Sequence, residues 1–259
     1  VLIAKTVAAI RVITVERGLD PRDFAMLAYG GAGPMFVTAV GREMGVCEVI
    51  VPQGPSVFSA WGMLMSDVVQ TYTQTMIGLL ADIGLASILQ DAQKLAVTAR
   101  QDLERGGFAP ADQAVEMAVE LRYFGQEHAL EVPLEKGDDL DAIRKRFDDI
   151  HRVRYGHAMA DPVQLVNLRV RGIGRNDKPK MQTIARSTGR MQPRKQRQAF
   201  CLARRAMTQF GIYHRDDLRD GDTVAGPAII EERTTTIVLH SDQAARVDRF
   251  GIIYVRQGV

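Results

Sequence analysis

The sequence lacks most of the features that place a chain in a specialised class. It has only two cysteines, Cys47 and Cys201, too far apart for a disulfide framework or a zinc site of the usual spacing. Its net charge is +2, which gives no reason to expect nucleic acid or a membrane surface as a partner. No apolar run is long enough to span a bilayer, and there is no signal peptide. We therefore predict buried thiols in a cytoplasmic protein.

Catalytic and metal-binding signatures are also scarce. The five histidines include no pair four residues apart and have no cysteine nearby, so no metal site is predicted. No serine lies in a Gly-x-Ser-x-Gly turn. His151 and His157, near Asp161, either converge on a ligand or make structural hydrogen bonds, and the structural role is favoured.

Two acidic positions leave alternatives open. Asp67 follows an apolar helix, and it either faces a cleft or simply ends that helix. Glu231 and Glu232, which precede three threonines, are expected on a strand edge, where a structural role is favoured. The sequence identifies no catalytic residue.

What is present is an ordinary globular composition, with 46% hydrophobic and 25% charged residues over 259 positions. This length favours one large domain or two modest ones, with a core that needs no disulfide or metal. The chain begins with Val1, and residues 2–17 already carry a helical apolar pattern, closed by Gly18. We therefore expect a largely buried helix here and a piece of a longer protein.

The clearest motif is a glycine-rich turn. A predicted buried strand over 24–28 leads into Gly30, Gly31, Ala32, Gly33 and Pro34, and a helix of small and apolar residues follows. Glycines allow main-chain angles and a close ligand approach that a β-carbon forbids. Proline suits the first turn of a helix, whose free N–H groups favour an anion such as a phosphate. The turn matches neither a Walker A loop nor a dinucleotide fingerprint, so a packing role stays open.

The rest of the chain predicts a mixed α/β fold. Residues 48–52 and 68–77 are expected strands, and 57–65 a helix that is apolar nearly all round and hence buried. Helices over 88–105 and 140–153 accompany a hairpin of 114–124 with 128–134 and a strand over 162–172. We divide the sequence into an α/β region, 1–80; an α+β region, 81–174; a basic stretch, 175–205; and a β-rich closing domain, a small barrel or sandwich, 206–259. The basic stretch is either a solvated linker or loop, which is favoured, or a phosphate-binding patch.

Four motifs, in order, then support a family resemblance. The glycine turn is followed by the run from Gly54 to Asp67, which reads GPSVFSAWGMLMSD. The hairpin carries LRYFGQ at 121–126, and His151 with Tyr155-Gly156 closes the helix after it. GPAIIEE at 226–232 precedes the threonines at 234–236. Together these motifs resemble the A subunits of the hydantoinase and 5-oxoprolinase family, which includes the matching subunits of acetone and acetophenone carboxylases.

The resemblance implies a fold, a cofactor and partners. Family members share an actin-like ATPase core of the sugar kinase, Hsp70 and actin type, and use ATP, with Mg²⁺, to activate a small-molecule substrate. A B-type subunit completes the chemistry, so a homo- or hetero-oligomer is expected. In that scheme Gly30, Gly31, Ala32, Gly33 and Pro34 contact the nucleotide. The chain would be the C-terminal part of a cyclic-amide hydrolase A subunit.

Two departures and two alternatives accompany this interpretation. The family's N-terminal phosphate loop is absent, so the isolated chain is expected to be inactive. Phe36 stands where the family often has a histidine, and phenylalanine cannot hydrogen-bond. As alternatives, the chain is a non-catalytic scaffold that docks the B-type subunit through residues 81–259, or part of an ATP-dependent ketone carboxylase. The substrate itself is not encoded in these motifs.

Overall fold

The chain crosses twice between two units, which are described separately. The computed structural model describes residues 1–258. Unit 1 consists of Val1–Leu64 together with the segment from Pro179 onward, and unit 2 consists of Met65–Lys178. Across the described residues, no helix is both long enough and apolar enough to cross a membrane.

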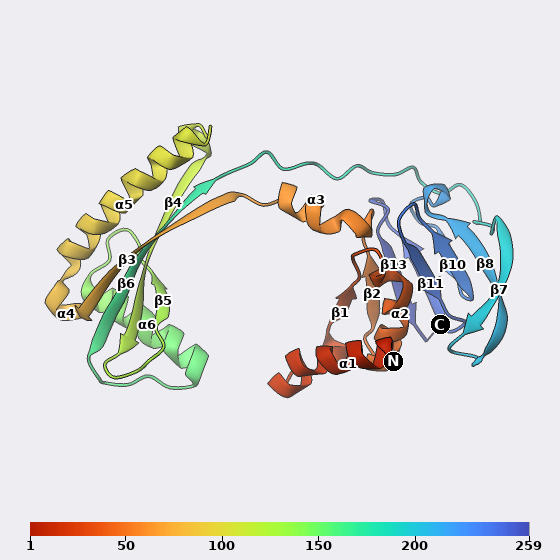
Figure 1. Cartoon of the computed structure of the whole chain (residues 1–259), viewed down its shortest axis with the longest axis horizontal. Coiled ribbons are helices and arrows are strands. Elements are labelled where there is room, and N and C mark those ends of the chain that lie inside the picture. Colours follow the sequence, from red (N-terminus) through yellow and green to blue (C-terminus); the bar gives the residue numbers. More distant parts are fainter. Residues whose placement is uncertain (259) are drawn as a thin grey trace. The chain divides into compact units, whose positions relative to one another are not determined.

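Unit 1 begins with alternating helices and strands, as the sequence predicts, and continues after residue 179 with strands (Figure 1). Its helices and strands, in chain order, are α1 Leu2–Ile13, β1 Ala25–Leu27, α2 Gly33–Met44, β2 Glu48–Val51, α3 Phe58–Leu64, β7 Lys195–Cys201, β8 Ala206–His214, β9 Thr223–Ala225, β10 Ala228–Glu231, β11 Thr236–Leu239, β12 Gln243–Val247 and β13 Ile253–Gln257.

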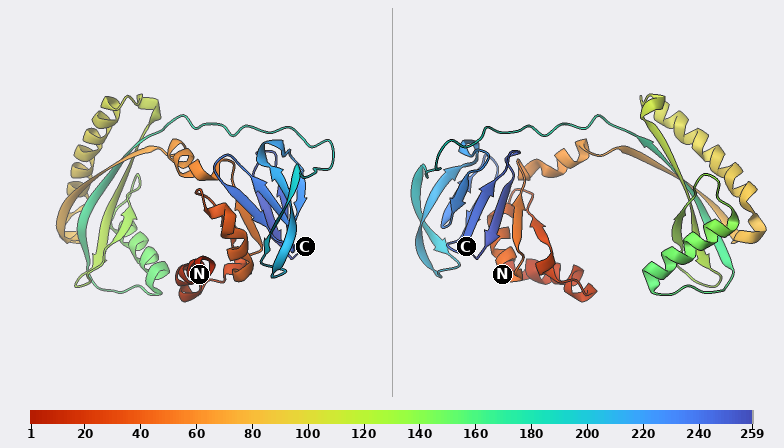
Figure 2. Two further views of the ribbon diagram at one scale, coloured as in Figure 1. Left: turned by 45° about the vertical axis from the view of Figure 1, so that its right-hand side comes forward. Right: turned by 180° about the vertical axis from the view of Figure 1, so that it is seen from behind.

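Two sheets build this unit (Figure 2). The larger has the strand order β1-β2-β13-β12-β9, with β1 and β2 parallel and the later strands antiparallel. The smaller has the order β11-β10-β8-β7. Strands from the last third of the chain therefore complete the sheet that β1 and β2 begin. The sequence assigned these strands to a region of their own, because local patterns do not reveal which strands pair.

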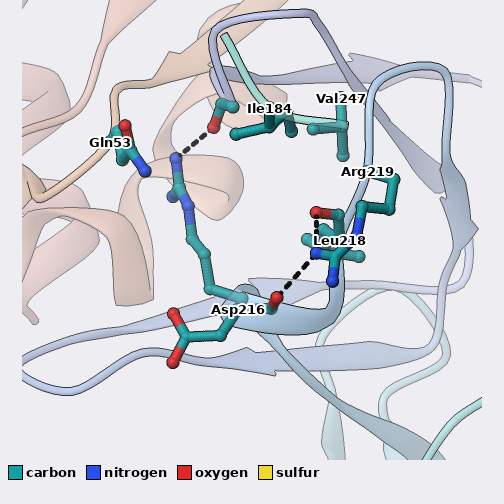
Figure 3. Close-up of a pocket in the computed structure, with 8 residues that line it drawn as sticks. Gln53, Ile184, Asp216, Leu218, Arg219 and Val247 are labelled. Atoms are coloured by element: carbon teal, nitrogen blue, oxygen red, sulfur yellow. Dashed lines mark hydrogen bonds between the residues drawn. The ribbon is translucent and has the colours of Figure 1, made fainter. Parts of the chain in front are cut away.

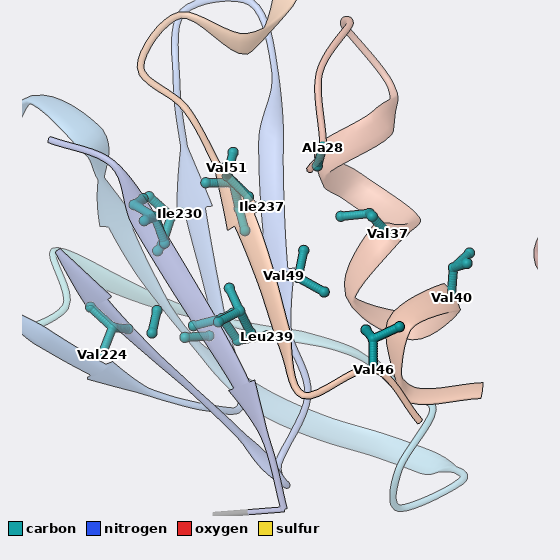
Figure 4. Packing of buried hydrophobic residues seen from close by; sticks show 14 of the residues in the cluster. Ala28, Val37, Val40, Val46, Val49, Val51, Val224, Ile230, Ile237 and Leu239 are labelled. Atoms are coloured by element: carbon teal, nitrogen blue, oxygen red, sulfur yellow. The ribbon is translucent and has the colours of Figure 1, made fainter. Parts of the chain in front are cut away.

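One apolar core joins the two sheets and α2 (Figure 4). Val37 of α2 points towards Val49 of β2, Val40 and Val51 belong to the same cluster, and Ile237 and its neighbours complete it from the smaller sheet. The burial alternates along β2, as expected for a strand with one covered face. The glycine turn thus lies at the start of a helix that is anchored on its inner side.

Four predictions of burial in the first 64 residues are wrong. Cys47, which was expected to be a buried thiol, is exposed. In α1 only Val7 is buried, and the helix ends at Ile13, before a single 3-10 turn. In β1 no residue is buried. In α3, predicted to be buried on all sides, none is buried either. An apolar pattern shows that a side chain favours burial, but it does not name the surface that covers it. In α1 and β1, Ile3, Ile10 and Met26 pack against the core of unit 1 and stay only partly buried.

Unit 2 follows the predicted order of elements closely. It contains β3 Val68–Leu79, α4 Leu80–Ile83, α5 Leu85–Arg105, β4 Gln113–Tyr123, β5 Leu130–Pro133, α6 Leu140–Tyr155 and β6 Val163–Gly174. The four strands form one antiparallel sheet in the order β3-β6-β4-β5. The predicted hairpin of β4 and β5 is confirmed. β3, which the sequence placed with the first region, belongs to this sheet.

The sheet of unit 2 has one apolar face and one charged face. Ile88 of α5 and Phe147 of α6 share a single buried cluster with Leu168 of β6 and its apolar neighbours. Arg169, next to Leu168 in β6, points to the opposite face of the sheet. There it pairs with Glu120 and, at 3.1 Å, with Glu131. This alternation is what a period of two in the sequence produces. The two long helices therefore cover the sheet on one side.

Candidate functional site

The glycine turn links the end of β1 to the start of α2. Gly30 has a φ of 86°, which explains a glycine at this position. The helix begins at Gly33, with Pro34 in its first turn, and no side chain caps it. In the described part of the chain, the N–H groups of Gly31, Ala32 and Gly33 have no hydrogen-bond acceptor. Gly31 and Ala32 are exposed, so these donors are accessible to an anion.

A second turn lies beside the first. It covers residues 54–56 and follows β2, and Gly54 has a φ of 59°. The N–H of Gly30 donates to the carbonyl oxygen of Pro55 at 2.7 Å, which ties the two turns together. β1 and β2 are parallel, so both turns follow the carboxyl ends of neighbouring strands. This edge of a parallel pair is where open α/β sheets place their ligands.

A third segment, from the far end of the chain, holds both turns. It is the loop of residues 232–235 between β10 and β11, here called the threonine loop. The hydroxyl of Thr235 donates to the carbonyl oxygen of Gly31 at 2.6 Å. The N–H of Gly54 donates to the carboxylate of Glu232 at 3.2 Å, and the hydroxyls of Ser56 and Thr234 share a short hydrogen bond. Residues 178 to 204 positions apart therefore form one site.

The side chain of Arg215 links the threonine loop to the end of β2. It lies in a hollow of about 190 Å³, shown in Figure 3 with Gln53, Ile184 and Val247 among its lining residues. One guanidinium nitrogen, Nη2, donates to the carbonyl oxygens at positions 51, 52 and 251, at 3.3, 2.9 and 2.7 Å. The other, Nη1, lies 3.4 Å from the carboxylate of Glu232. The two side chains are only 7% and 13% exposed.

Burial dominates the electrostatics of this ion pair. It lowers the pKa of Arg215, and the nearby carboxylates only partly oppose that change. Burial also raises the pKa of Glu232, against the opposing effect of the Arg215 charge. The carbonyl oxygens and the Gly54 N–H supply the hydrogen bonds that a buried ion pair needs. The pair is therefore a structural anchor that links the end of β2, the second turn and the loop at Gly251.

A hollow lined by apolar and aromatic side chains opens beside the second turn. Its volume is about 380 Å³, and Phe58 and Trp61 line it together with Gly54 and Lys180. The rings of Phe58 and Trp61 stack with centroids 5.6 Å apart. Tyr29, directly before the glycine turn, lies 6.0 Å from Phe58. The turns thus border an apolar surface as well as free N–H donors.

The other residues singled out in the sequence lie elsewhere in the structure. Phe36 is partly buried against the core of unit 1. Asp67 accepts hydrogen bonds from Asn176, at 3.1 Å, and from Lys178. It therefore links the first residues of unit 2 to its last residues. The Lys178 ammonium and the Asn176 N–H lower the pKa of its carboxyl.

His151 and His157 lie close to each other, as the sequence indicated, and a hydrogen bond joins them. His151 is buried in unit 2, and its Nδ1 lies 2.7 Å from the carbonyl oxygen of His157. Within residues 1–258, no group of three or more His, Cys, Asp or Glu side chains is placed to hold a metal ion.

Sequence reasoning missed Arg215 and the role of Thr235. The motif GPAIIEE with its threonines did mark the threonine loop as a unit, but the predicted strand edge is wrong: β10 lies between β11 and β8, and Glu232 follows it in the loop, paired with Arg215. Nothing in the spacing of Arg215 connects it to β2, because the contact spans 163 residues. Such a link becomes visible only in the folded chain.

The family models cover nearly the whole chain. The model described as hydantoinase/oxoprolinase matches residues 1–72, and the model described as hydantoinase/oxoprolinase C-terminal domain matches residues 82–258. Among similar proteins, the caprolactamase subunit alpha of Pseudomonas jessenii is 32% identical over 90% of this chain and 35% of its own length. The 5-oxoprolinase 1 of Arabidopsis thaliana is 26% identical over 95% of this chain and 20% of its own length.

Solved structures show the same fold. The ATP-dependent caprolactamase of Pseudomonas jessenii superposes with a TM-score of 0.76 at 29% identity, over 99% of this chain and 39% of the other. Nucleotide-free acetone carboxylase superposes with a TM-score of 0.83 at 21% identity, over 99% of this chain and 38% of the other. The chain thus spans between a fifth and two fifths of the length of these relatives.

Proposed function

Because this chain belongs to the hydantoinase/oxoprolinase family, we propose that it is the C-terminal part of an ATP-dependent enzyme that opens a cyclic amide. The relatives named above include an ATP-dependent caprolactamase and a 5-oxoprolinase. ATP would supply the phosphoryl group that activates the amide carbonyl. The role of this chain is to contribute one side of the nucleotide cleft through the glycine turn.

The observation that carries this proposal is the set of free amides at the glycine turn. Gly31, Ala32 and Gly33 present three N–H donors without a partner in the described structure, at the N-terminus of a 12-residue helix. Such a terminus favours an anionic oxygen through its donors and through the helix dipole. A phosphate group of ATP fits these donors. We expect Mg²⁺ to accompany the bound nucleotide.

Architecture and partners extend the same proposal. Within this proposal, β1, α2 and β2 of unit 1 belong to an actin-like ATPase lobe whose sheet is completed by β13, β12 and β9, and unit 2 is the α+β region. A B-type subunit is the proposed partner for completing the reaction, in a hetero-oligomer. The caprolactamase relative is itself named as a subunit alpha.

The test is ATP turnover by the gene product that carries this chain, with and without a B-type subunit. We expect ATP hydrolysis to rise when hydantoin, 5-oxoproline or caprolactam is added. Stimulation by acetone and bicarbonate alone would instead assign the chain to a carboxylase, the alternative that its similarity to an acetone carboxylase beta subunit favours. A folded complex that consumes no ATP with any of them contradicts the enzymatic proposal.

Gly31→Val tests the glycine turn within that reaction. A β-carbon at Gly31 would come no closer than 3.9 Å to the carbonyl oxygen of Thr234, so the fold has room for it. The branched side chain would cover the neighbouring amides, and we expect ATP affinity to fall at least about tenfold, or 1.4 kcal/mol. Gly189→Val, at another glycine with open space around it, is the matched control and should bind ATP normally. Unchanged affinity in Gly31→Val would remove the turn from the site.

A further inference from the structure

We propose that Thr235 is a positioning residue for the nucleotide, because its hydroxyl sets the direction in which the Ala32 amide points. This inference rests on the proposed nucleotide site. It assigns a specific task to a side chain that lies 204 positions from the glycine turn in the sequence.

The argument begins with the geometry of one peptide group. The Thr235 hydroxyl donates to the carbonyl oxygen of Gly31 at 2.6 Å. The C=O of Gly31 and the N–H of Ala32 belong to the same planar trans peptide, so they point in opposite directions. A carbonyl held towards the threonine loop therefore directs the Ala32 N–H away from that loop. That N–H is exposed and has no acceptor among the described residues.

The neighbouring contacts leave the turn little freedom. Its first amide, Gly30 N–H, is occupied by the carbonyl oxygen of Pro55. Its end is fixed by α2, in which the buried hydroxyl of Thr38 donates to the carbonyl oxygen of Val238 at 2.6 Å. Between these two fixed points, glycines allow the Gly31–Ala32 peptide to rotate. Among the hydrogen bonds of the described structure, the one donated by the Thr235 hydroxyl holds the carbonyl oxygen of the Gly31–Ala32 peptide.

Thr235 is itself held rigidly enough for this task. It is 8% exposed, and its carbonyl oxygen accepts the Glu232 N–H at 3.0 Å. The next residue starts β11, which pairs with β10 and contacts α2. A donor on a rigid element orients its acceptor at a smaller cost in entropy than a donor on a mobile loop. The free amide would thus be aimed before any nucleotide arrives.

Three substitutions separate positioning from general support of the fold. Thr235→Val keeps the shape and removes the hydroxyl, Thr235→Ser restores the hydroxyl, and Thr236→Val changes the adjacent threonine, whose side chain makes no hydrogen bond in the described structure. Each is made in the full gene product. ATP affinity is measured by calorimetry, KM for ATP and kcat by turnover, and folding by thermal unfolding.

We expect Thr235→Val to weaken ATP binding about five- to tenfold, the effect of one lost hydrogen bond. KM for ATP should rise in proportion with kcat nearly unchanged, Thr235→Ser should recover the affinity, and Thr236→Val should match the parent. A purely structural role would lower kcat through a smaller folded fraction and leave KM unchanged. If Thr235→Val does not fold, comparing the ATP affinity of Thr235→Ala with that of Thr235→Ser tests the hydroxyl in the same way.

The outcomes separate the two proposals. If the parent protein binds ATP and Thr235→Val binds it equally well, the positioning role is wrong and the nucleotide site stands. If Thr235→Val and Thr235→Ser lose affinity equally, the hydroxyl is not the group responsible, and the positioning role is again wrong. If the parent protein binds no ATP, both proposals are overturned.

Discussion

At the scale of single residues, Arg215 is the side chain on which the candidate site depends most. Its guanidinium donates to three backbone carbonyl oxygens and faces the buried carboxylate of Glu232. Arginine suits this place because its planar group presents several donors in fixed directions. Lysine would offer a single ammonium on a flexible stem. Arg215, which directly follows β8, therefore supports the second turn through Glu232 and the end of β2.

Replacing Arg215 with methionine keeps much of the volume and removes all of its donors. Glu232 would then lose its buried counter-ion and keep only the Gly54 N–H, and the three carbonyl oxygens would lose their donor, so we expect unit 1 to lose about 3 kcal/mol of stability. Urea unfolding followed by the fluorescence of Trp61, the single tryptophan, measures this. Arg233→Met, at an exposed position in the threonine loop, should change stability by less than about 0.5 kcal/mol. Equal stability of the two variants would contradict the anchoring role.

Residue identity shows how much of the site the sequence could predict. Gly30 was expected to adopt a conformation open to glycine, and its φ of 86° confirms this. Gly226 was seen only as part of a motif, and the structure supplies the reason: a β-carbon there would overlap the carbonyl oxygen of His240. Motifs mark which residues are special. The contact that makes them special lies in a distant segment.

At the scale of elements, charged side chains fasten α6 to the sheet of unit 2. Arg146 of α6 donates to the carbonyl oxygen of Pro133 at the end of β5 and to both oxygens of Asp138 in the connecting loop. The hydrogen bonds from Arg146 hold the pKa of Asp138 below its usual value. A lowered pKa means that the folded state prefers the ionised carboxyl. The resulting stability is present above the ordinary pKa of aspartate, near 4, and is lost as the pH falls through the lower folded value.

Asp138→Asn should therefore destabilise unit 2 in a pH-dependent way. At pH 7 we expect a loss of about 1 kcal/mol, and the difference from the parent should shrink as the pH falls below about 4. Urea unfolding followed by far-ultraviolet circular dichroism at several pH values checks this. Asp149→Asn removes an exposed pair with Arg152 on the same helix and is the control. A difference that stays constant down to pH 3 would show that ionisation of Asp138 is not involved.

Elements were predictable where their periodicity was strong and their partner was local. β4, β5, α5 and α6 lie close to the ranges expected from the sequence, since each pairs or packs within one short stretch of chain. β7 and β9 were missed: β7 is rich in charged and polar residues, and β9 has three residues. The predicted burial of α3 was wrong, because apolarity alone does not identify a covering surface.

At the scale of the whole molecule, the chain consists of two units with separate apolar cores. Trp61 lies in unit 1, whereas the two longest helices, α5 and α6, lie in unit 2. Fluorescence therefore reports mainly on unit 1, and the helical signal of circular dichroism mainly on unit 2. This division provides a direct test of cooperativity.

We expect urea to unfold the two units in separate transitions. The fluorescence midpoint and the circular dichroism midpoint should differ, and Arg215→Met should lower only the first. Asp138→Asn should lower only the second. Coincident midpoints in the parent and in both variants would show that the units unfold as one.

The contact between Thr235 and Gly31 also bears on how the protein is made. Unit 2 contains only residues 65–178, so its core can form while later residues are still inside the ribosome. The glycine turn is synthesised some 200 residues before the segment that orients it. Contacts between such distant positions form slowly. A nascent chain stalled before residue 235 would thus carry a folded unit 2 and an incomplete unit 1, and the incomplete unit 1 is where a chaperone would bind.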